Sequence, residues 1–491
     1  MASKRSEASL VHALFIIFLE YFSWGLLTVP VINVLADTFP SNKFLMNGLI
    51  LGLKGILSFL SSPLIGAFSD VCGRKPFLLL TVFFTCMPIP FLKISPWWYF
   101  TLFTISGLFS VTFSVVLAYV ADITEANERT TACGLVSATF AASLVTSPAL
   151  GAYLGRVYSD DVVVLLATLI AVLDLLFILC CVPESRKKPQ TVIEGINNGF
   201  SANPFIILRF LRDEQTILRL SVITFLSYLP EAGQFSCFFV YLRLVVGFSA
   251  ESVALFIAFV GVLSVLSQTG ILLLVTQKAG PKSAITMGLI FQFVQLVWYG
   301  LGSAHWIMWV AGLFAALSQM TYPAISAFVS LQTNKELQGT VQGILSGIRG
   351  LCQGMGPAVF GLIFYAFGMD LTSDAESAGH IGLGPQFPVP NIRLQSPLIP
   401  DIKSSISVST KPIQNISSVP GPPFLCGALL VIFALLINFS LPHRRKLLLM
   451  HRRSGSSKFD TTALLIDDNE ICTKTPIDDD DDDERRKDAE E

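Results

Sequence analysis

The sequence predicts an all-helical membrane protein with twelve transmembrane helices, arranged as two pseudo-symmetric six-helix bundles. Of its 491 residues, 52% are hydrophobic and only 14% are charged, a composition typical of polytopic membrane proteins. Apolar windows that are long enough to cross a bilayer core about 30 Å thick recur along the chain. The two halves of the chain also match each other at a nearly constant offset.

Each predicted helix is an apolar window of about 20 residues or more. Lys4 and Arg5 precede the first window, as in a signal peptide, but this window is too long for such a signal and contains Glu20. We therefore expect an uncleaved first helix. The windows lie near residues 11–36, 44–68, 76–93, 98–122, 131–155 and 162–183, and then near 218–242, 250–275, 283–303, 306–330, 340–367 and 423–441.

The two sets of six windows read as an internal repeat. Phe18-Leu19-Glu20-Tyr21 aligns with Phe225-Leu226-Ser227-Tyr228, and Pro148 of the fifth window aligns with Pro357 of the eleventh. Parallel repeats of this kind place a substrate near the bilayer midplane between the two halves. The predicted parts are a first bundle at 1–183, a cytoplasmic linker at 184–215, a second bundle at 216–442 with a lumenal or extracellular loop at 369–422, and a disordered cytoplasmic tail at 443–491.

Short loops on one side of the predicted bundle carry most of the Lys and Arg residues, which predicts that this side and both termini are cytoplasmic. The loop 369–422 then faces the lumen or the exterior. It contains the sequon Asn415-Ile416-Ser417, so we expect glycosylation at Asn415.

The tail carries two features of its own. A basic cluster at 443–453 is expected to contact anionic lipid of the bilayer. The sequence around Asp460, Leu464 and Leu465 fits the acidic dileucine pattern that sorting adaptors read. These features are compatible with an endolysosomal, Golgi or plasma membrane location.

The ten residues from Gly66 to Lys75, read as a short turn between the second and third helices, form the most informative motif. Asp70 can pair with a base or with the positive N-terminal end of a neighbouring helix, and Gly73 permits a backbone angle that the turn requires. Arg74 and Lys75 are expected to anchor the third helix at the anionic leaflet. Such a contact can close in one conformation and open in another; the alternative is a plain turn on the positive side of the membrane.

This stretch resembles the loop signature G-x-x-x-D-x-x-G-R-K of the major facilitator superfamily. The region from Ala118 to Thr124, with Asp122, followed by Glu128 and Arg129, is similar to the tetracycline-antiporter branch. The resemblance implies a two-lobed carrier in which helices one, four, seven and ten line the solute path, with Asp122 and Arg129 at the same gate as Asp70. Runs at 44–50, 79–86, 93–100 and 225–234 closely resemble the hippocampus-abundant-transcript proteins, which are solute carriers of this superfamily.

The chain departs from the drug antiporters in two places. Phe103 occupies the position where those proteins carry an arginine tied to proton coupling. In the fifth helix, three glycines of the antiporter signature are replaced, with Ser143 and Ser147 at two of their positions. Drug–proton antiport therefore does not carry over from the resemblance alone. The second copy of the loop motif also has Gln277 in place of the aspartate.

Ionisable residues inside apolar helices cost several kcal/mol to insert and usually face a cavity or a partner. Glu20 and Glu231 lie on the equivalent first and seventh helices and are candidates for substrate contact or for carrying a proton. The alternative is that they form structural ion pairs with Lys54 and Arg349. Polar residues on the expected lining helices add weaker candidates: Asn33, Tyr228, Gln234, Gln319 and Tyr322.

The sequence thus predicts a secondary transporter of a small organic solute that works by alternating access, with proton coupling as a hypothesis. The alternative is a transporter-like membrane receptor or sorting partner without solute flux. The sequence contains no nucleophile–base pair, phosphate-binding loop or metal-ligand cluster, so it indicates neither an enzyme nor a cofactor or metal. Nothing in it suggests binding to nucleic acid.

Overall fold

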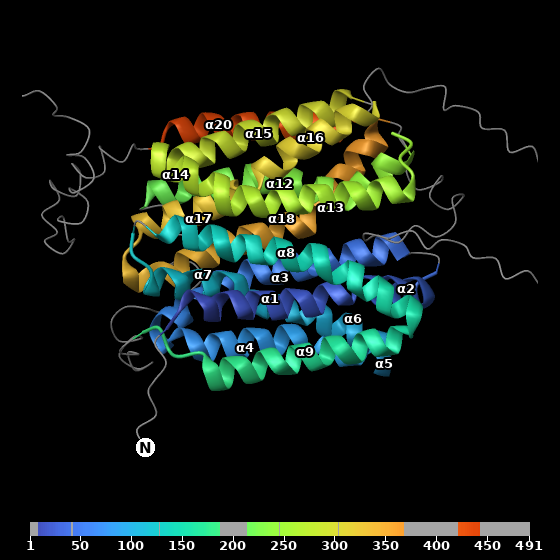
Figure 1. Cartoon of the computed structure of the whole chain (residues 1–491), viewed down its shortest axis with the longest axis horizontal. Coiled ribbons are helices and arrows are strands. Elements are labelled where there is room, and N and C mark those ends of the chain that lie inside the picture. The colour runs from blue at the N-terminus through green and yellow to red at the C-terminus, as the bar shows by residue number, and fades with distance from the viewer. Residues whose placement is uncertain are drawn as a thin grey trace, which may run out of the picture. The chain divides into compact units, whose positions relative to one another are not determined.

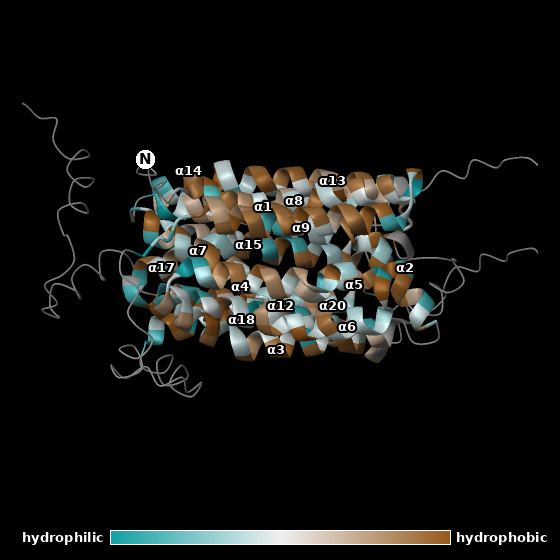
Figure 2. Ribbon diagram, turned by 90° about the horizontal axis from the view of Figure 1, so that it is seen from below, coloured by the Kyte–Doolittle hydropathy of each residue, from teal (hydrophilic) through white to brown (hydrophobic). Residues whose placement is uncertain are grey.

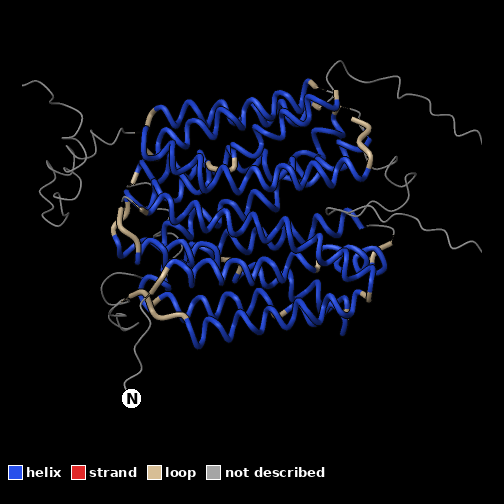
Figure 3. Tube along the Cα trace, viewed as in Figure 1, coloured by secondary structure: helices blue, strands red, loops and turns tan. Residues whose placement is uncertain are grey.

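The computed structural model describes residues 8–40, 43–126, 128–186, 214–244, 246–302, 304–367 and 421–441. The predicted glycosylation site at Asn415 and the sorting pattern at Asp460, Leu464 and Leu465 lie outside these ranges, as do the basic cluster of the tail and most of the predicted linker. Within the described ranges every regular element is a helix, as Figure 3 shows.

The first half of the chain forms a group of helices that we call the first lobe. Two predicted spans are broken rather than straight: one bends after Leu26, and another is interrupted before Pro88, whose ring removes a backbone donor. The helices are α1 (Leu10–Leu26), α2 (Thr28–Thr38), α3 (Lys43–Cys72), α4 (Arg74–Cys86), α5 (Pro88–Ile94), α6 (Pro96–Ile105), η1 (Ser106–Phe109), α7 (Thr112–Ile123), α8 (Arg129–Val157) and α9 (Asp160–Cys181).

The second half forms the second lobe, and its helices repeat the pattern of the first. Helices α8 and α18 both have 29 residues and both contain a proline at the equivalent position, Pro148 and Pro357. The helices are α12 (Gln215–Leu244), α13 (Ala250–Leu266), η2 (Ser267–Ile271), α14 (Leu272–Ala279), α15 (Pro281–Leu301), α16 (His305–Ser318), α17 (Thr321–Gln332), η3 (Lys335–Leu337), α18 (Gln338–Ala366) and α20 (Pro422–Phe439).

Hydropathy agrees with a membrane-spanning bundle. In the described ranges, nine helical segments are long and apolar enough to cross a bilayer, or up to ten when the bent pair α1 and α2 counts as one span. Helices α12 and α18 are also long enough, at 30 and 29 residues, and they bring the described segments to the twelve that the sequence predicts. Figure 2 shows hydrophobic residues along the helices, with many hydrophilic ones toward their ends.

The predicted turn between the second and third spans is mostly helical. Helix α3 continues through Asp70 to Cys72 and α4 begins at Arg74, so only Gly73 lies between them. Its φ of 102° is in the region that side chains other than glycine's disfavour, which confirms the expected role of this glycine. Gly280, between α14 and α15, repeats the conformation with a φ of 83°.

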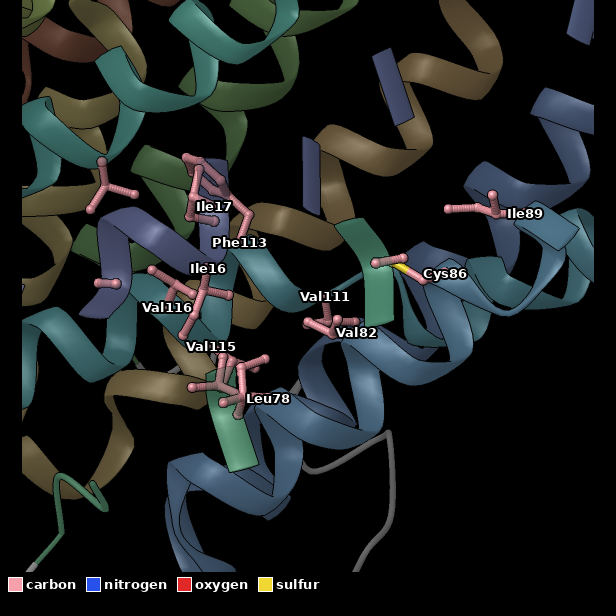
Figure 4. Close-up of a cluster of buried hydrophobic side chains, with 14 of the residues drawn as sticks. Ile16, Ile17, Leu78, Val82, Cys86, Ile89, Val111, Phe113, Val115 and Val116 are labelled. Carbon is pink, nitrogen blue, oxygen red and sulfur yellow. The ribbon is translucent and has the colours of Figure 1, made fainter. Parts of the chain in front are cut away.

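Each lobe has its own hydrophobic core. In the first lobe, Ile16 of α1, Leu78 and Val82 of α4 and Val115 of α7 belong to one cluster of buried side chains, part of which appears in Figure 4. A second cluster joins α12, α15 and α20 in the second lobe. Large apolar side chains that point outward, such as Leu169 and Leu436, suit contact with lipid.

The lobes meet where α3 runs beside α18, and Figure 1 shows the helices of each half gathered on either side of this contact. Glycines permit the close approach: a Cβ atom at Gly66 would overlap the carbonyl oxygen of Gly339, and one at Gly55 would crowd the backbone of Gly350. Small residues at such crossings let helix backbones come together in membranes. This contact places Asp70 and Arg349 at the boundary between the lobes.

Candidate functional site

The first candidate site is a charged cluster at one end of the α3–α18 contact. One carboxylate oxygen of Asp70 accepts a hydrogen bond from the backbone N–H of Gly339 at 2.8 Å. The other accepts from the N–H and the hydroxyl of Thr340, at 2.7 and 2.8 Å. The first turn of a helix has unpaired N–H groups and a partial positive charge. Asp70 of the first lobe therefore binds the start of α18 in the second lobe.

Arg74 organises the acidic side of this cluster. Its side chain is fully buried and forms ion pairs with Asp70 at 2.7 Å and with Asp122 of α7 at 2.9 Å. The guanidinium also donates to the Ser69 hydroxyl at 2.7 Å. The expectation that Arg74 anchors α4 at the lipid surface is therefore wrong, because the protein encloses it. Lys75 donates to the Leu179 carbonyl at 2.8 Å.

Glu184 holds the start of α4 in place. Its carboxylate accepts hydrogen bonds from the backbone N–H groups of Arg74 at 2.8 Å and Lys75 at 3.0 Å. The neighbouring Ser185 hydroxyl donates to Asp122 at 3.2 Å. Residues just after α9 thus join the same network, which we call the Asp70 cluster: Asp70, Arg74, Asp122 and Glu184 with the first turn of α18.

Arg129 makes a second polar contact between the lobes near this cluster. Its guanidinium donates to the backbone carbonyl of Ser330 in α17 at 3.1 Å. It also donates to the carbonyls of Ala121 at 3.0 Å and Thr124 at 3.2 Å, at the end of α7. Arg129 therefore ties the end of one helix in the first lobe to its counterpart in the second.

Glu20 lies in the interior of the first lobe with a polar but uncharged surrounding. One oxygen accepts hydrogen bonds from the Thr85 hydroxyl of α4 at 2.9 Å and the Thr112 hydroxyl of α7 at 3.0 Å. The other oxygen has no hydrogen-bond donor among the described residues. The Lys54 ammonium lies 3.6 Å from the centre of the Phe103 ring, a cation–π contact.

Arg349 lies between the lobes in a cage of aromatic rings. The guanidinium carbon is 4.6 Å from the ring centre of Tyr322 and 4.7 Å from that of Tyr228, both in the second lobe. It is 5.3 Å from Phe140 and 5.5 Å from Phe113, both in the first lobe. Helix α18 of the second lobe thus carries a cation that also contacts rings of the first lobe.

The other predicted path residues divide into two groups. Glu231 accepts a hydrogen bond from the Gln319 amide at 3.0 Å, and the Gln234 carbonyl accepts from Gln295 at 2.8 Å, so these lie together inside the second lobe. Asn33 is exposed and donates to Asp160 at 3.0 Å, away from the buried group.

The alternative of structural ion pairs finds no support in the described residues. No carboxylate oxygen of Glu20 or Glu231 lies within ion-pair distance of Lys54 or Arg349 there. The opposite charges still attract each other over a longer distance. Asp174 of α9 is also fully buried, and neither of its oxygens has a donor in the described part of the chain.

Several contributing residues carried no signal that sequence reasoning used. Gly339 and Thr340 act through backbone N–H groups that any residue type could supply. Thr85 and Phe113 are common in apolar helices. Glu184 offered a usable signal, because a carboxylate directly after a transmembrane helix is available to cap a neighbouring helix start.

Two lobes that repeat each other, with a charged cluster across one end and buried charges between them, define a membrane carrier of the two-lobed type. Residues 13–357 match the family model of the Major Facilitator Superfamily, and the chain belongs to this superfamily of transporters. It is 52% identical to the Hippocampus abundant transcript 1 protein of Homo sapiens over 89% of this chain and 86% of that protein. It is 52% identical to human Hippocampus abundant transcript-like protein 1, over 89% of this chain and 81% of that one.

More distant similarities agree with this assignment. The Escherichia coli class C tetracycline resistance protein is 26% identical over 74% of this chain and 91% of its own length. The crystal structure of the human organic anion transporter MFSD10 matches with a TM-score of 0.67 at 18% identity, over 87% of this chain and 98% of that one. The Escherichia coli fucose:proton symporter matches with a TM-score of 0.59 at 15% identity, again over 87% of this chain and 98% of that one. These two structures share the fold.

Proposed function

We propose that the protein is a secondary carrier of a small organic solute, whose two lobes rock about a central site to give alternating access. The observation that carries this proposal is the contact of Asp70 with the N–H groups of Gly339 and Thr340. This contact joins the lobes at one end only of the long α3–α18 interface. Breaking it would free that end to open while the rest of the interface acts as a pivot.

The charge arrangement suits a reversible contact. Asp70 has two sets of partners: Arg74 in its own lobe and the first turn of α18 in the other. When the lobes separate, Arg74 still compensates the carboxylate, so no unpaired charge is left in a poorly hydrated place. The cost of opening is thereby limited to the hydrogen bonds from α18.

Proton coupling is part of the proposal and rests on Glu20 and Glu231. Both carboxyl groups lie inside their lobes without an ion-pair partner among the described residues, and a carboxyl group in such a place can take up and release a proton. We also propose that both termini are cytoplasmic, so that the Asp70 cluster closes the cytoplasmic side, and that the protein resides in an endolysosomal, Golgi or plasma membrane.

Replacing Asp70 by Asn tests the proposal. The amide has one acceptor oxygen instead of two and places an N–H₂ group against the N–H donors of α18. Hydrogen bonds to charged groups contribute about 1.5–3 kcal/mol, so the closed end should lose roughly tenfold or more of its population. We expect a solute that wild-type protein moves in an untargeted metabolite comparison of cells to move several times more slowly with Asp70→Asn.

Asp161→Asn is the matched control, since Asp161 is an exposed aspartate that pairs with Lys93 away from the cluster. It should transport like the wild type. If wild-type protein changes the distribution of no solute, the alternative of a receptor or sorting partner without flux gains support. If Asp70→Asn transports at the wild-type rate, the cluster is not a working gate.

A further inference from the structure

We infer that the central site takes an organic carboxylate with a flat, apolar body, and that Arg349 binds its carboxylate group. This inference rests on the proposed transport function and names the class of solute. It is drawn from the surroundings of Arg349, in particular from what compensates its charge and from which helices supply those groups.

The charge of Arg349 has weak compensation. A guanidinium stays protonated in proteins, and among the described residues its neighbours are ring faces rather than a carboxylate within ion-pair distance. A cation–π contact is worth about 0.5–2 kcal/mol. The Nε–H of Arg349 is buried and has no acceptor in the described part of the chain. A carboxylate is the group whose geometry a guanidinium matches with two parallel hydrogen bonds.

The position of Arg349 is that of a solute site in a two-lobed carrier. Phe113 and Phe140 come from α7 and α8 of the first lobe, whereas Tyr228 and Tyr322 come from α12 and α17 of the second. A group bound here touches both lobes and is released when they separate. Substrate sites of such repeats lie near the midplane at the interface between the halves.

The rings indicate what the rest of the solute looks like. Tyr21 extends the aromatic surface, with its ring centre 4.5 Å from Phe140 and 6.4 Å from Phe113. Aromatic surfaces of this kind favour a flat apolar partner through stacked and edge-to-face contacts. A solute with one carboxylate and an aromatic or similar planar body would match both the charge and the rings.

Glu231 is the competing anion. Its carboxylate attracts Arg349 across the second lobe and accepts a hydrogen bond from Gln319. Neutralising Glu231 should therefore leave more of the positive potential of Arg349 for a bound carboxylate. Variants at the two positions are expected to shift anion binding in opposite directions, which a general loss of stability would not produce.

The test uses the purified full-length protein in detergent and two probes of nearly equal shape, benzoate and the uncharged benzamide. At constant pH and ionic strength, benzoate should raise the melting temperature more than benzamide does. Arg349→Gln should abolish this preference, with benzoate binding weakened about tenfold or more, whereas Glu231→Gln should strengthen it. Arg219→Gln is the matched control, because Arg219 is exposed and donates to the Ser440 carbonyl.

Arg349→Lys is the second variant in case Arg349→Gln does not fold. It keeps the charge but loses the planar fork, so it should retain a reduced preference for benzoate. The inference is overturned if benzoate stabilises the wild type no more than benzamide, or if Arg349→Gln keeps the preference. Transport of uncharged or cationic solutes that depends on Asp70 would overturn this inference alone and leave the proposed carrier function standing.

Discussion

At the scale of single residues, the structure separates charges that bind each other from charges that do not. Arg74 is enclosed by Asp70 and Asp122, and all three lie at the boundary between helices of the first lobe. Glu20 and Arg349 instead face hydroxyl groups and aromatic rings. The first group suits a structural and gating role, and the second leaves charge available for a proton or a solute.

Glu20→Gln tests the proton hypothesis with little change in packing. The amide oxygen can still accept from Thr85 and Thr112, and the N–H₂ group takes the position of the oxygen without a donor. We expect uptake that no longer responds to an imposed pH gradient, with folding retained. The measurement is solute uptake across that gradient, and Glu231→Gln is assayed in parallel.

Asp174→Asn is the control, since Asp174 is a buried carboxyl group on α9, outside the expected solute path. It should leave the response to the gradient intact. Unchanged, gradient-sensitive uptake in both the Glu20 and the Glu231 variants would rule out the proposed coupling.

At the scale of helices, the ends of α3, α4 and α18 position the Asp70 cluster. Gly73 turns the chain within one residue, so that α4 starts directly beside the carboxylate on the last turn of α3. Glu184 then binds the first N–H groups of α4, and Asp70 binds those of α18. Two helix starts are thus held by carboxylates from other helices or from the segment after α9, which makes the geometry of the cluster depend on packing.

Replacing Glu184 by Gln tests this positioning role. The variant loses the charge that favours two backbone N–H groups, which should lower the free energy of unfolding by about 1–2 kcal/mol. Thermal unfolding of the purified protein measures the effect. Glu336→Gln is the control, because Glu336 lies in η3 outside the cluster; an equal loss there would show that the effect is not specific to the start of α4.

At the scale of the whole described bundle, the interface of α3 with α18 decides how closely the lobes approach. Gly66 lies against the backbone of Gly339, next to the hydrogen bonds of Asp70. A larger side chain at Gly66 would act as a wedge at this end of the interface. The proposed rocking motion therefore predicts a shift toward the conformation in which this end is open.

Gly66→Val should lengthen the distance between spin labels placed on α9 and α14 at the Asp70 end, as measured by double electron–electron resonance. Gly361→Val is the matched control, because a Cβ atom at Gly361 of α18 meets nothing within 4 Å. A distance distribution in Gly66→Val that equals the control would contradict the view that the lobes separate at this end.

The sequence alone determined the helical fold, the repeat of the two halves and the glycine between α3 and α4, because hydrophobic length and backbone sterics are local properties. It also singled out Asp70, Arg74 and Asp122 through their motif. Only the tertiary structure decided their partners. Asp70 binds backbone groups 269 positions further along the chain, and Arg349 gathers rings from four helices. Such contacts depend on how the two lobes pack, and no local pattern encodes that arrangement.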